Sequence, residues 1–142
     1  MKKIKKFRNI VFFIAVIIFI AVAIFGYFLY NKPHRDVQKA KVDFTITSPA
    51  LLSEFESNST TATEKYIGKI LLVSGKVESI NFNDTIASAQ LTGDGTFGIN
   101  CSFNREGTKG LNDIQVGNLI QVKGECKGYI DDVILNNCYL IK

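Results

Sequence analysis

The residues best suited to chemistry in this 142-residue chain are three cysteines, Cys101, Cys126 and Cys138. A structural zinc site needs about four ligands and usually includes a close Cys pair, but the sequence contains no C-x-x-C motif. Its one histidine, His34, is distant from the cysteines in sequence. We therefore expect no metal and no other cofactor. A disulfide is the favoured use of the thiols, and the alternative is that all three are small core residues.

Few other residues offer catalytic chemistry. Asp131 and Asp132 are adjacent carboxylates, but neighbours on a strand face opposite ways, so the pair is typical of a solvated turn. The GDG segment at 93–95 is too short for a phosphate loop and indicates a hairpin turn. Glu54 and Glu56 fit the solvated face of a helix. We therefore predict no catalytic residues and no enzymatic activity.

The basic charge of the chain is concentrated at its N-terminus. The formal net charge is +4, but residues 1–35 hold seven Lys and Arg and no acid, whereas residues 36–142 have a net charge of −3. Residues 10–30 carry no charge, and a helix of that length spans roughly 31 Å, about the thickness of a bilayer core. Cations gather on the cytoplasmic side of a span, and five precede this one: Lys2, Lys3, Lys5, Lys6 and Arg8.

These features predict a basic cytoplasmic tail at 1–9, a transmembrane helix at 10–30, a polar stalk at 31–42 and a domain at 43–142. The alternative is a cleaved signal peptide, because residues 21–23 fit the small-x-small cleavage pattern. Cleavage there would leave seven apolar residues at the new N-terminus, so we favour an uncleaved signal-anchor. The predicted protein crosses the cytoplasmic membrane once, with its N-terminus inside and its domain outside the cytoplasm.

The first part of this domain indicates short helices. The alternating segment 43–47 predicts a brief extended stretch. Ser48 and Pro49 then fit the N-cap and first position of a helix. Residues 58–59 should break this helix, and a second helical stretch should end at Gly68.

From residue 69 onward the apolar residues recur every second position, which indicates strands. We predict five, at about 69–80, 85–92, 96–103, 118–126 and 132–141. The link at 104–117 should form a short helical plug whose Leu111, Ile114 and Val116 pack beneath a barrel. Three meander strands, a plug and a final hairpin are the order of a five-stranded Greek-key barrel, the OB-fold. The predicted fold class is therefore all-β with minor α, with one or two short helices before the barrel.

The strand order of such a barrel also selects one cysteine pair. Its third and fifth strands are parallel neighbours, so Cys101 and Cys138 could reach the Cα separation of about 4.4–6.8 Å that a disulfide needs. If Cys126 lies opposite Val133, it is about five rows, or roughly 16 Å, from Cys138. We predict a Cys101–Cys138 disulfide and a buried free Cys126 thiol, a choice that a register bulge at Asn136 and Asn137 could reverse.

The outer surface of the predicted strands is polar. We take four residues as the candidate ligand face: Gln90, Asn100, Ser102 and Gln121. Single-stranded nucleic acid needs a cationic groove and aromatic platforms, whereas Phe97 and Phe103 have the parity of core residues and the domain is acidic. We therefore predict a non-catalytic binding or interaction module for a protein, peptide or glycan. Binding of single-stranded nucleic acid is the alternative.

Four fragments of the domain resemble one bacterial family in their order and spacing. They are YIGKILLVSGKVESI (66–80), GINCSF (98–103), IQVGNLIQVKGECKGY (114–129) and DVILNNCYL (132–140). The family is called tRNA_anti-like, and the resemblance covers about residues 43–142. It implies an OB-fold that is often attached to a signal or membrane segment, and hence a protein of the bacterial envelope. The name reflects similarity to anticodon-binding domains and implies neither an activity nor a set of binding residues.

Overall fold

The computed structural model describes residues 2–30, 36–84, 86–93 and 95–141, with the side chains of residues 2–9 and 29 left out of that description. The chain forms two compact units, Met1–Arg35 and Asp36–Lys142. The first contains one helix, α1 (Lys2–Tyr30). Its segment Ile10–Phe28 is long and apolar enough to cross a membrane, and none of it is buried. This confirms an N-terminal apolar helix, which suits a membrane anchor or a signal sequence.

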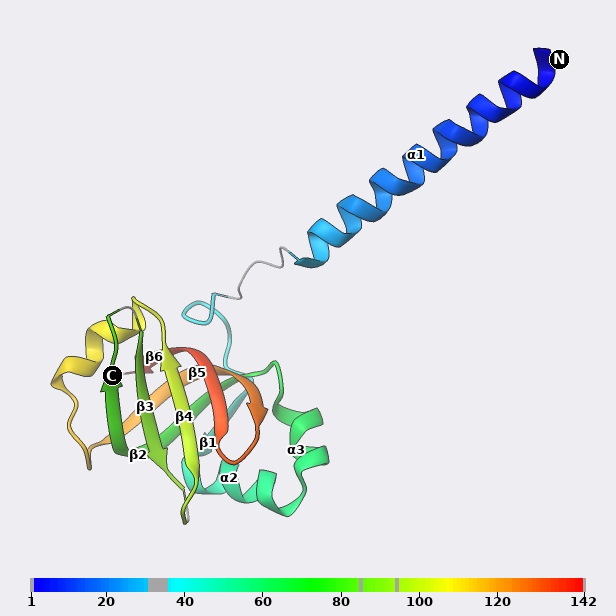
Figure 1. The fold of residues 1–142 in the computed structure, drawn as a ribbon. Helices are drawn as coiled ribbons and strands as arrows, with labels where there is room; N and C mark the ends of the chain where they lie inside the picture. Colours follow the sequence, from blue (N-terminus) through cyan, green and yellow to red (C-terminus); the bar gives the residue numbers. More distant parts are fainter. Residues whose placement is uncertain (1, 31–35, 85, 94, 142) are drawn as a thin grey trace. The chain divides into compact units, whose positions relative to one another are not determined.

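The second unit is a closed barrel of five strands (Figure 1). The strands are β2 (Ile70–Phe82), β3 (Ala87–Thr92), β4 (Gly98–Phe103), β5 (Leu119–Tyr129) and β6 (Val133–Ile141). Around the barrel their order is β2-β3-β4-β6-β5, and β2 pairs with β5 to close it. Only β4 and β6 run parallel among these neighbours. The predicted OB-fold is therefore confirmed.

A sixth strand and two helices precede the barrel. The strand β1 (Phe44–Thr47) pairs in parallel with the first half of β2, a pairing that the sequence alone did not predict. The helix α2 (Ser48–Ser57) follows directly and buries Leu51, Leu52 and Phe55 against the core. The helix α3 (Ser59–Tyr66) buries Ala62 and Tyr66. Both helices thus pack apolar side chains against the barrel interior.

The start of α2 differs from the prediction. Thr47 occupies the N-cap position, and Ser48 is the first helical residue. The Ser48 hydroxyl is buried and donates a hydrogen bond to the Thr92 carbonyl at 2.6 Å, so it ties the helix to β3 rather than capping it. A Cβ at position 75 would collide with this Ser48 side chain, which explains the glycine there. The predicted break at Asn58 is confirmed, because its Oδ1 accepts a hydrogen bond from the Thr61 N–H.

The loops at the barrel ends correct two further expectations. The short helix η1 (Gly107–Asp113) buries Leu111, as predicted, and Ile114 packs partly against the core. Val116 is 66% exposed, because the chain has already left the core before β5 begins. Phe97 is 39% exposed, since it belongs to the turn before β4 and not to the strand. The predicted Asp94–Gly95 hairpin turn falls partly outside the described residues, because Asp94 is not described.

The strand β6 contains a bulge at Asn136 and Asn137. Cys101 pairs with Leu135 and Phe103 with Cys138, so β6 uses one more residue than β4 over the same length. Asn137 has φ 53° and is the one non-glycine residue with a positive φ among those described. The bulge changes the alternation of the strand, so that Leu135 and Cys138 both face the core although they are three residues apart.

Residues 36–41 pack against the barrel as a strap that starts the second unit. Ala40 N–H donates to the Asp36 carbonyl at 2.9 Å, which forms a single turn, and the Val37 side chain is buried. The Lys123 ammonium of β5 donates hydrogen bonds to the carbonyls of Gln38 and Ala40. Lys123 is only 8% exposed because this strap covers it. The preceding residues of the predicted stalk, 31–35, lie outside the described part of the chain.

Candidate functional site

Uncharged polar side chains occupy the outer surface of four adjacent strands, and we call this surface the polar face. It comprises Ser79, Asn81, Ser88, Gln90, Asn100, Ser102 and Asn136. Gln90 lies directly opposite Asn100, and Ser88 lies opposite Ser102. On the opposite edge of β3, Gln90 also pairs with Ser79 of β2, so the polar residues form rows across the strands. Side chains opposite one another on a sheet stand about 5 Å apart, so a single ligand could contact several of them.

The structure brings three of the four predicted ligand residues together. Gln90, Asn100 and Ser102 all belong to the polar face. Gln121 does not, because it lies on β5 opposite Ser74 and Ile141, and neither of these residues belongs to the polar face. Its Nε2 donates to the Ser74 hydroxyl at 3.2 Å, which is a structural contact between β5 and β2.

Sequence reasoning missed members of the polar face that lie at bulges. Strict alternation from Val73 through Val77 would turn Ser79 inward, but the register shifts between Val77 and Ser79, and Ser79 then faces Gln90 outside. In β6, alternation from the buried Val133 and Leu135 already turns Asn136 outward, and the bulge additionally keeps Asn137 out of the core. The clustering of Asn and Ser in these stretches was the available signal, since neither residue suits an apolar core.

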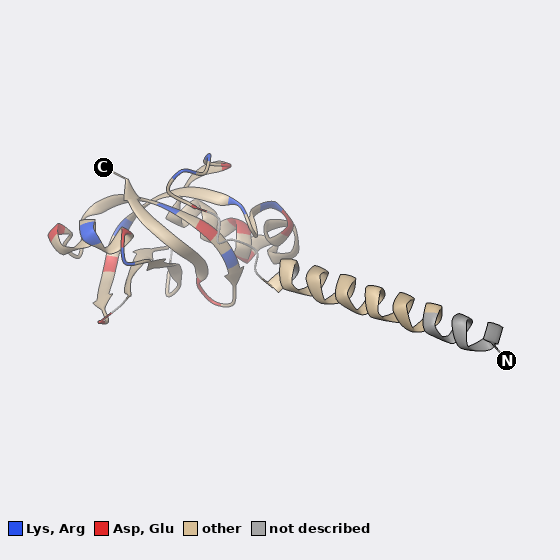
Figure 2. Cartoon of the chain, turned by 90° about the horizontal axis from the view of Figure 1, so that it is seen from above, with Lys and Arg blue, Asp and Glu red and all other residues tan. Residues whose placement is uncertain are grey.

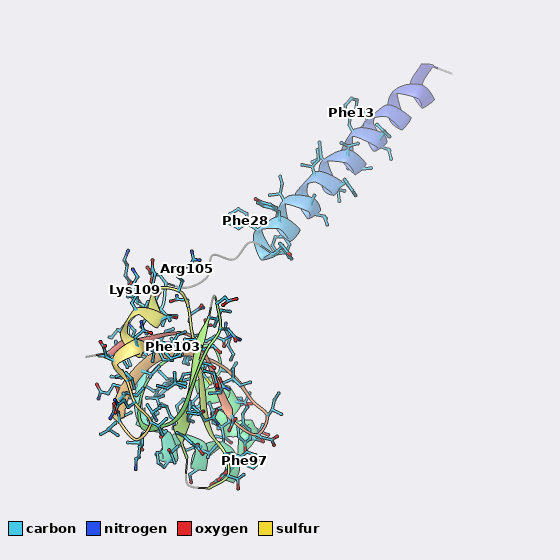
Figure 3. The ribbon with its side chains drawn as sticks, turned by 60° about the vertical axis from the view of Figure 1, so that its left-hand side comes forward. Phe13, Phe28, Phe97, Phe103, Arg105 and Lys109 are labelled. Carbon is cyan, nitrogen blue, oxygen red and sulfur yellow. The ribbon has the colours of Figure 1, made fainter. Side chains whose placement is uncertain are left out.

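One end of the polar face is hollowed into a cavity of about 490 Å³, which we call the amide pocket. It is lined by Ile86, Ser102, Phe103, Asn104, Arg105, Asn136 and Asn137. Figure 3 shows Arg105 and Lys109 at this end of the barrel and Phe97 at the opposite end. A volume of this size lies in the range of small-ligand sites, which is about 300–1,000 Å³.

Most polar groups of the amide pocket are available to a ligand. Asn104 is committed to structure: its Nδ2 donates to the Tyr139 hydroxyl and its Oδ1 accepts from the Gly107 N–H, both at 2.8 Å. Among the described residues, by contrast, no partner is found for the side chains of Ser102, Arg105, Asn136 and Asn137. The pocket therefore offers hydroxyl, carboxamide and guanidinium groups above an apolar floor.

Charges around the barrel are mixed. Figure 2 shows Lys and Arg interspersed with Asp and Glu, with no continuous basic band in the part of the chain described. Arg105 is the one cation lining the amide pocket, and Glu106 follows it in sequence. Asp84 and the exposed Phe82 line a neighbouring cavity of about 430 Å³ that shares Ile86. This arrangement provides one cation and one exposed aromatic ring, and not the basic groove that a nucleic-acid backbone requires.

The three cysteines are buried free thiols in this structure. Burial, and next the adjacent Cys101 thiol, raise the pKa of Cys138 well above its usual range. Burial raises the pKa of Cys126 to about 11. Cys126 pairs with Leu135 and not with Val133 as expected, because both β5 and β6 shift register nearby. The bulge at Asn136 and Asn137 is present, but the thiol that interacts with Cys138 is that of Cys101, on the neighbouring parallel strand. The Cys101–Cys138 disulfide remains a prediction.

Two of the carboxylates singled out in the sequence, Asp132 and Glu54, make structural contacts. Asp132 Oδ1 accepts a hydrogen bond from the Gly98 N–H at 2.7 Å, which joins two turns. Glu54 is solvent-accessible, as expected, and also links the two helices through Lys65 at 2.8 Å and the Tyr66 hydroxyl at 3.0 Å. The Lys65 hydrogen bond is the main reason why the pKa of Glu54 is lowered. Among the described residues no group of three or more His, Cys, Asp or Glu is placed to hold a metal ion.

The fold and the polar face define an OB-fold protein with a hydrogen-bonding outer surface. The chain belongs to the tRNA_anti-like family, whose profile matches residues 1–140. No curated protein matches the chain. Similar solved structures include a "putative nucleic acid-binding lipoprotein" of Klebsiella pneumoniae, at 19% identity and TM-score 0.57, covering 78% of this chain and 100% of that one.

A second similar structure is described as a "putative aspartyl-tRNA synthetase" of Leishmania major, at 13% identity and TM-score 0.50. The match covers 86% of this chain and 26% of that protein. At these identities both likenesses show the fold alone.

Proposed function

We propose that this protein is a membrane-anchored, non-catalytic binding module whose polar face contacts its ligand outside the cytoplasm. The observation that carries this proposal is the polar face itself: six Ser, Asn and Gln side chains in register across β2, β3 and β4, with Asn136 beside them at the bulge of β6. Carboxamides and hydroxyls donate and accept hydrogen bonds, so the surface suits the backbone of a peptide or protein, or the hydroxyls of a glycan. The amide pocket at its end would receive one group of that ligand.

The anchor and its orientation rest on α1. None of its apolar segment is buried, and five cations precede it, which favours retention of the N-terminus in the cytoplasm. The description of the Klebsiella protein as a lipoprotein supports an envelope location. A periplasmic reporter fused after Lys142 should be active outside the cytoplasm, and the mature protein should keep its full mass. Activity of the reporter only inside the cytoplasm would contradict the orientation, and a mass loss of residues 1–23 would contradict the anchor.

Binding is a better fit than catalysis to the groups at the site. Two of the four carboxylates singled out in the sequence are engaged elsewhere: Asp132 with the Gly98 N–H and Glu54 with Lys65. The polar face presents amides and hydroxyls, which position a ligand but transfer no proton near neutral pH.

Binding of single-stranded nucleic acid is the second candidate. The family's OB-fold and the description of the Klebsiella protein favour it, and so do Arg105 and the exposed Phe82 near the amide pocket. The net charge of −3 on residues 36–142 opposes it, because phosphate binding depends on neutralisation by Lys and Arg.

Site-specific photocrosslinking in native membranes tests the binding surface. A photoreactive residue at Gln90 or Asn100 should give discrete adducts, whereas one at Thr61, an exposed position on α3, should give none. Equal labelling from all three positions would contradict the assignment of the polar face. Nuclease-sensitive adducts, together with salt-dependent retention on single-stranded DNA, would instead select the second candidate.

A further inference from the structure

The bulge in β6 gives the amide pocket an arrangement that a regular strand cannot produce. Consecutive residues of a strand normally point to opposite faces. Because Leu135 and Cys138 both face the core, the two residues between them, Asn136 and Asn137, are both excluded from it and both line the pocket. Two adjacent carboxamides therefore border one cavity.

The backbone at Asn137 is strained for this arrangement. A positive φ of 53° disfavours any residue with a Cβ by roughly 1–2 kcal/mol, although Asn tolerates it better than most. Bulges and such backbone outliers concentrate at ligand sites, where they re-aim side chains. Glycine would satisfy the backbone at this position, but it would remove the carboxamide from the pocket.

The other lining groups specify the chemistry of the ligand. Arg105 presents a planar fork of donors that matches a carboxylate. Ile86 is 55% exposed and, with Phe103, supplies an apolar wall. The pocket thus combines one cation, two unengaged carboxamides and a surface for a small apolar group. Asp84 lines the neighbouring cavity, and Arg105 is the one cation in the lining of the amide pocket, so the pocket suits a single negative charge better than a polyanion.

We propose that the amide pocket binds the free C-terminal carboxylate of a peptide whose last side chain is apolar. The carboxylate lies between the Arg105 guanidinium and the carboxamides of Asn136 and Asn137, and the last side chain packs against Ile86. The preceding residues of the peptide follow the polar face. This inference rests on the proposed function, because it names the ligand class of the same binding surface.

Fluorescence anisotropy with the full chain in zwitterionic nanodiscs tests the inference. The probe is a pentapeptide, Gly-Ser-Gly-Ala-Leu, labelled at its N-terminus, and the comparison is the same peptide with a C-terminal amide. We expect the free acid to bind at least about 10-fold more tightly, because it alone forms charge-assisted hydrogen bonds with the guanidinium.

Three variants locate the effect. Arg105→Gln should remove the preference for the acid. Asn137→Gly keeps the positive φ and removes only the carboxamide, so it should weaken binding of the acid several-fold without loss of folding by circular dichroism. Lys109→Gln is the control, because this nearby cation does not line the pocket, and its affinity should equal that of the wild type.

Equal affinity for the free-acid and amidated peptides, or no binding of either at millimolar concentration, overturns the inference. The proposed function is then judged separately, by the crosslinking result at Gln90. Tighter binding of a labelled 12-nucleotide oligothymidine, lost in Arg105→Gln, overturns it in favour of nucleic acid. If crosslinking at Gln90 fails while the acid preference holds, the pocket assignment stands and the wider polar face does not.

Discussion

The strap at 36–41 is held by a buried cation, and Lys123→Met tests what that contact contributes. Methionine keeps most of the aliphatic packing but removes the ammonium that donates to the Gln38 and Ala40 carbonyls. A hydrogen bond from a charged donor contributes about 1.5–3 kcal/mol. Loss of two such bonds is partly offset, because the freed carbonyls regain water and no charge remains buried. We therefore expect the free energy of unfolding to fall by about 2 kcal/mol.

A double-mutant cycle with Val37→Ala shows whether the strap docks as one unit. Val37 is 1% exposed, and its truncation should cost about 1–2 kcal/mol by itself. If Lys123 and Val37 hold the same segment, the second substitution costs less once the first has loosened the strap. The expected coupling is about 0.5–1 kcal/mol, which is within the range of contacts that share a structural element.

The assay is urea unfolding of residues 36–142, followed by circular dichroism and by the fluorescence of the tyrosines, since the chain has no tryptophan. For a domain of this size, 2 kcal/mol corresponds to a fall in Tm of roughly 8–16 °C. A Lys123→Met effect below about 0.5 kcal/mol, or strict additivity with Val37→Ala, would refute the reasoning.

Three further predictions concern stability. In protein produced under oxidising conditions, mass analysis of non-reduced peptides should show Cys101 linked to Cys138. Reduction of this disulfide, which closes a loop of about 40 residues, should lower the free energy of unfolding by roughly 4 kcal/mol. A bridge that includes Cys126 would show the assignment to be wrong. Asn137→Val should destabilise the domain by about 1–2 kcal/mol while Asn137→Gly should not, as measured by urea unfolding; equal effects would argue against the strained backbone. The pKa of Glu54 is lower in the folded protein than its unfolded value near 4.5, so the ionised carboxylate stabilises the fold above that pH. This contribution is lost as the pH falls through the folded pKa. The difference in free energy of unfolding between wild type and Glu54→Gln should therefore vanish in acid.

The sequence predicted the architecture well because the barrel follows binary patterning. Alternation placed all five barrel strands within a few residues of their observed bounds, and Asn58 marked the break between the helices. The parallel pairing of β1 with β2 was not predictable, because no local pattern in the segment 44–47 identifies its partner.

The site was predicted less completely, because bulges reverse the alternation on which the assignment of faces depends. Gln90 and Asn100 were placed together correctly, since both lie on regular strands. Ser79 was missed because it follows a register shift. Asn136 has the outward parity of a regular strand and was missed because no face was assigned to the last predicted strand. Gln121 shared the outward parity of the face but lies on a strand outside it, which only the closed strand order reveals.

The double pairing of β2 also has a consequence for how the domain folds. One half of β2 pairs with β3, a local hairpin, but the other half pairs Ile70 with Glu125, on a strand that is synthesised much later. Until β5 is available, the first half of β2 keeps an open edge that can associate with other chains. Closure of such a long-range pairing slows folding, so domains of this kind fold in milliseconds to seconds. A chain that leaves the ribosome or a translocation channel N-terminus first is therefore most prone to aggregation just before its last two strands arrive.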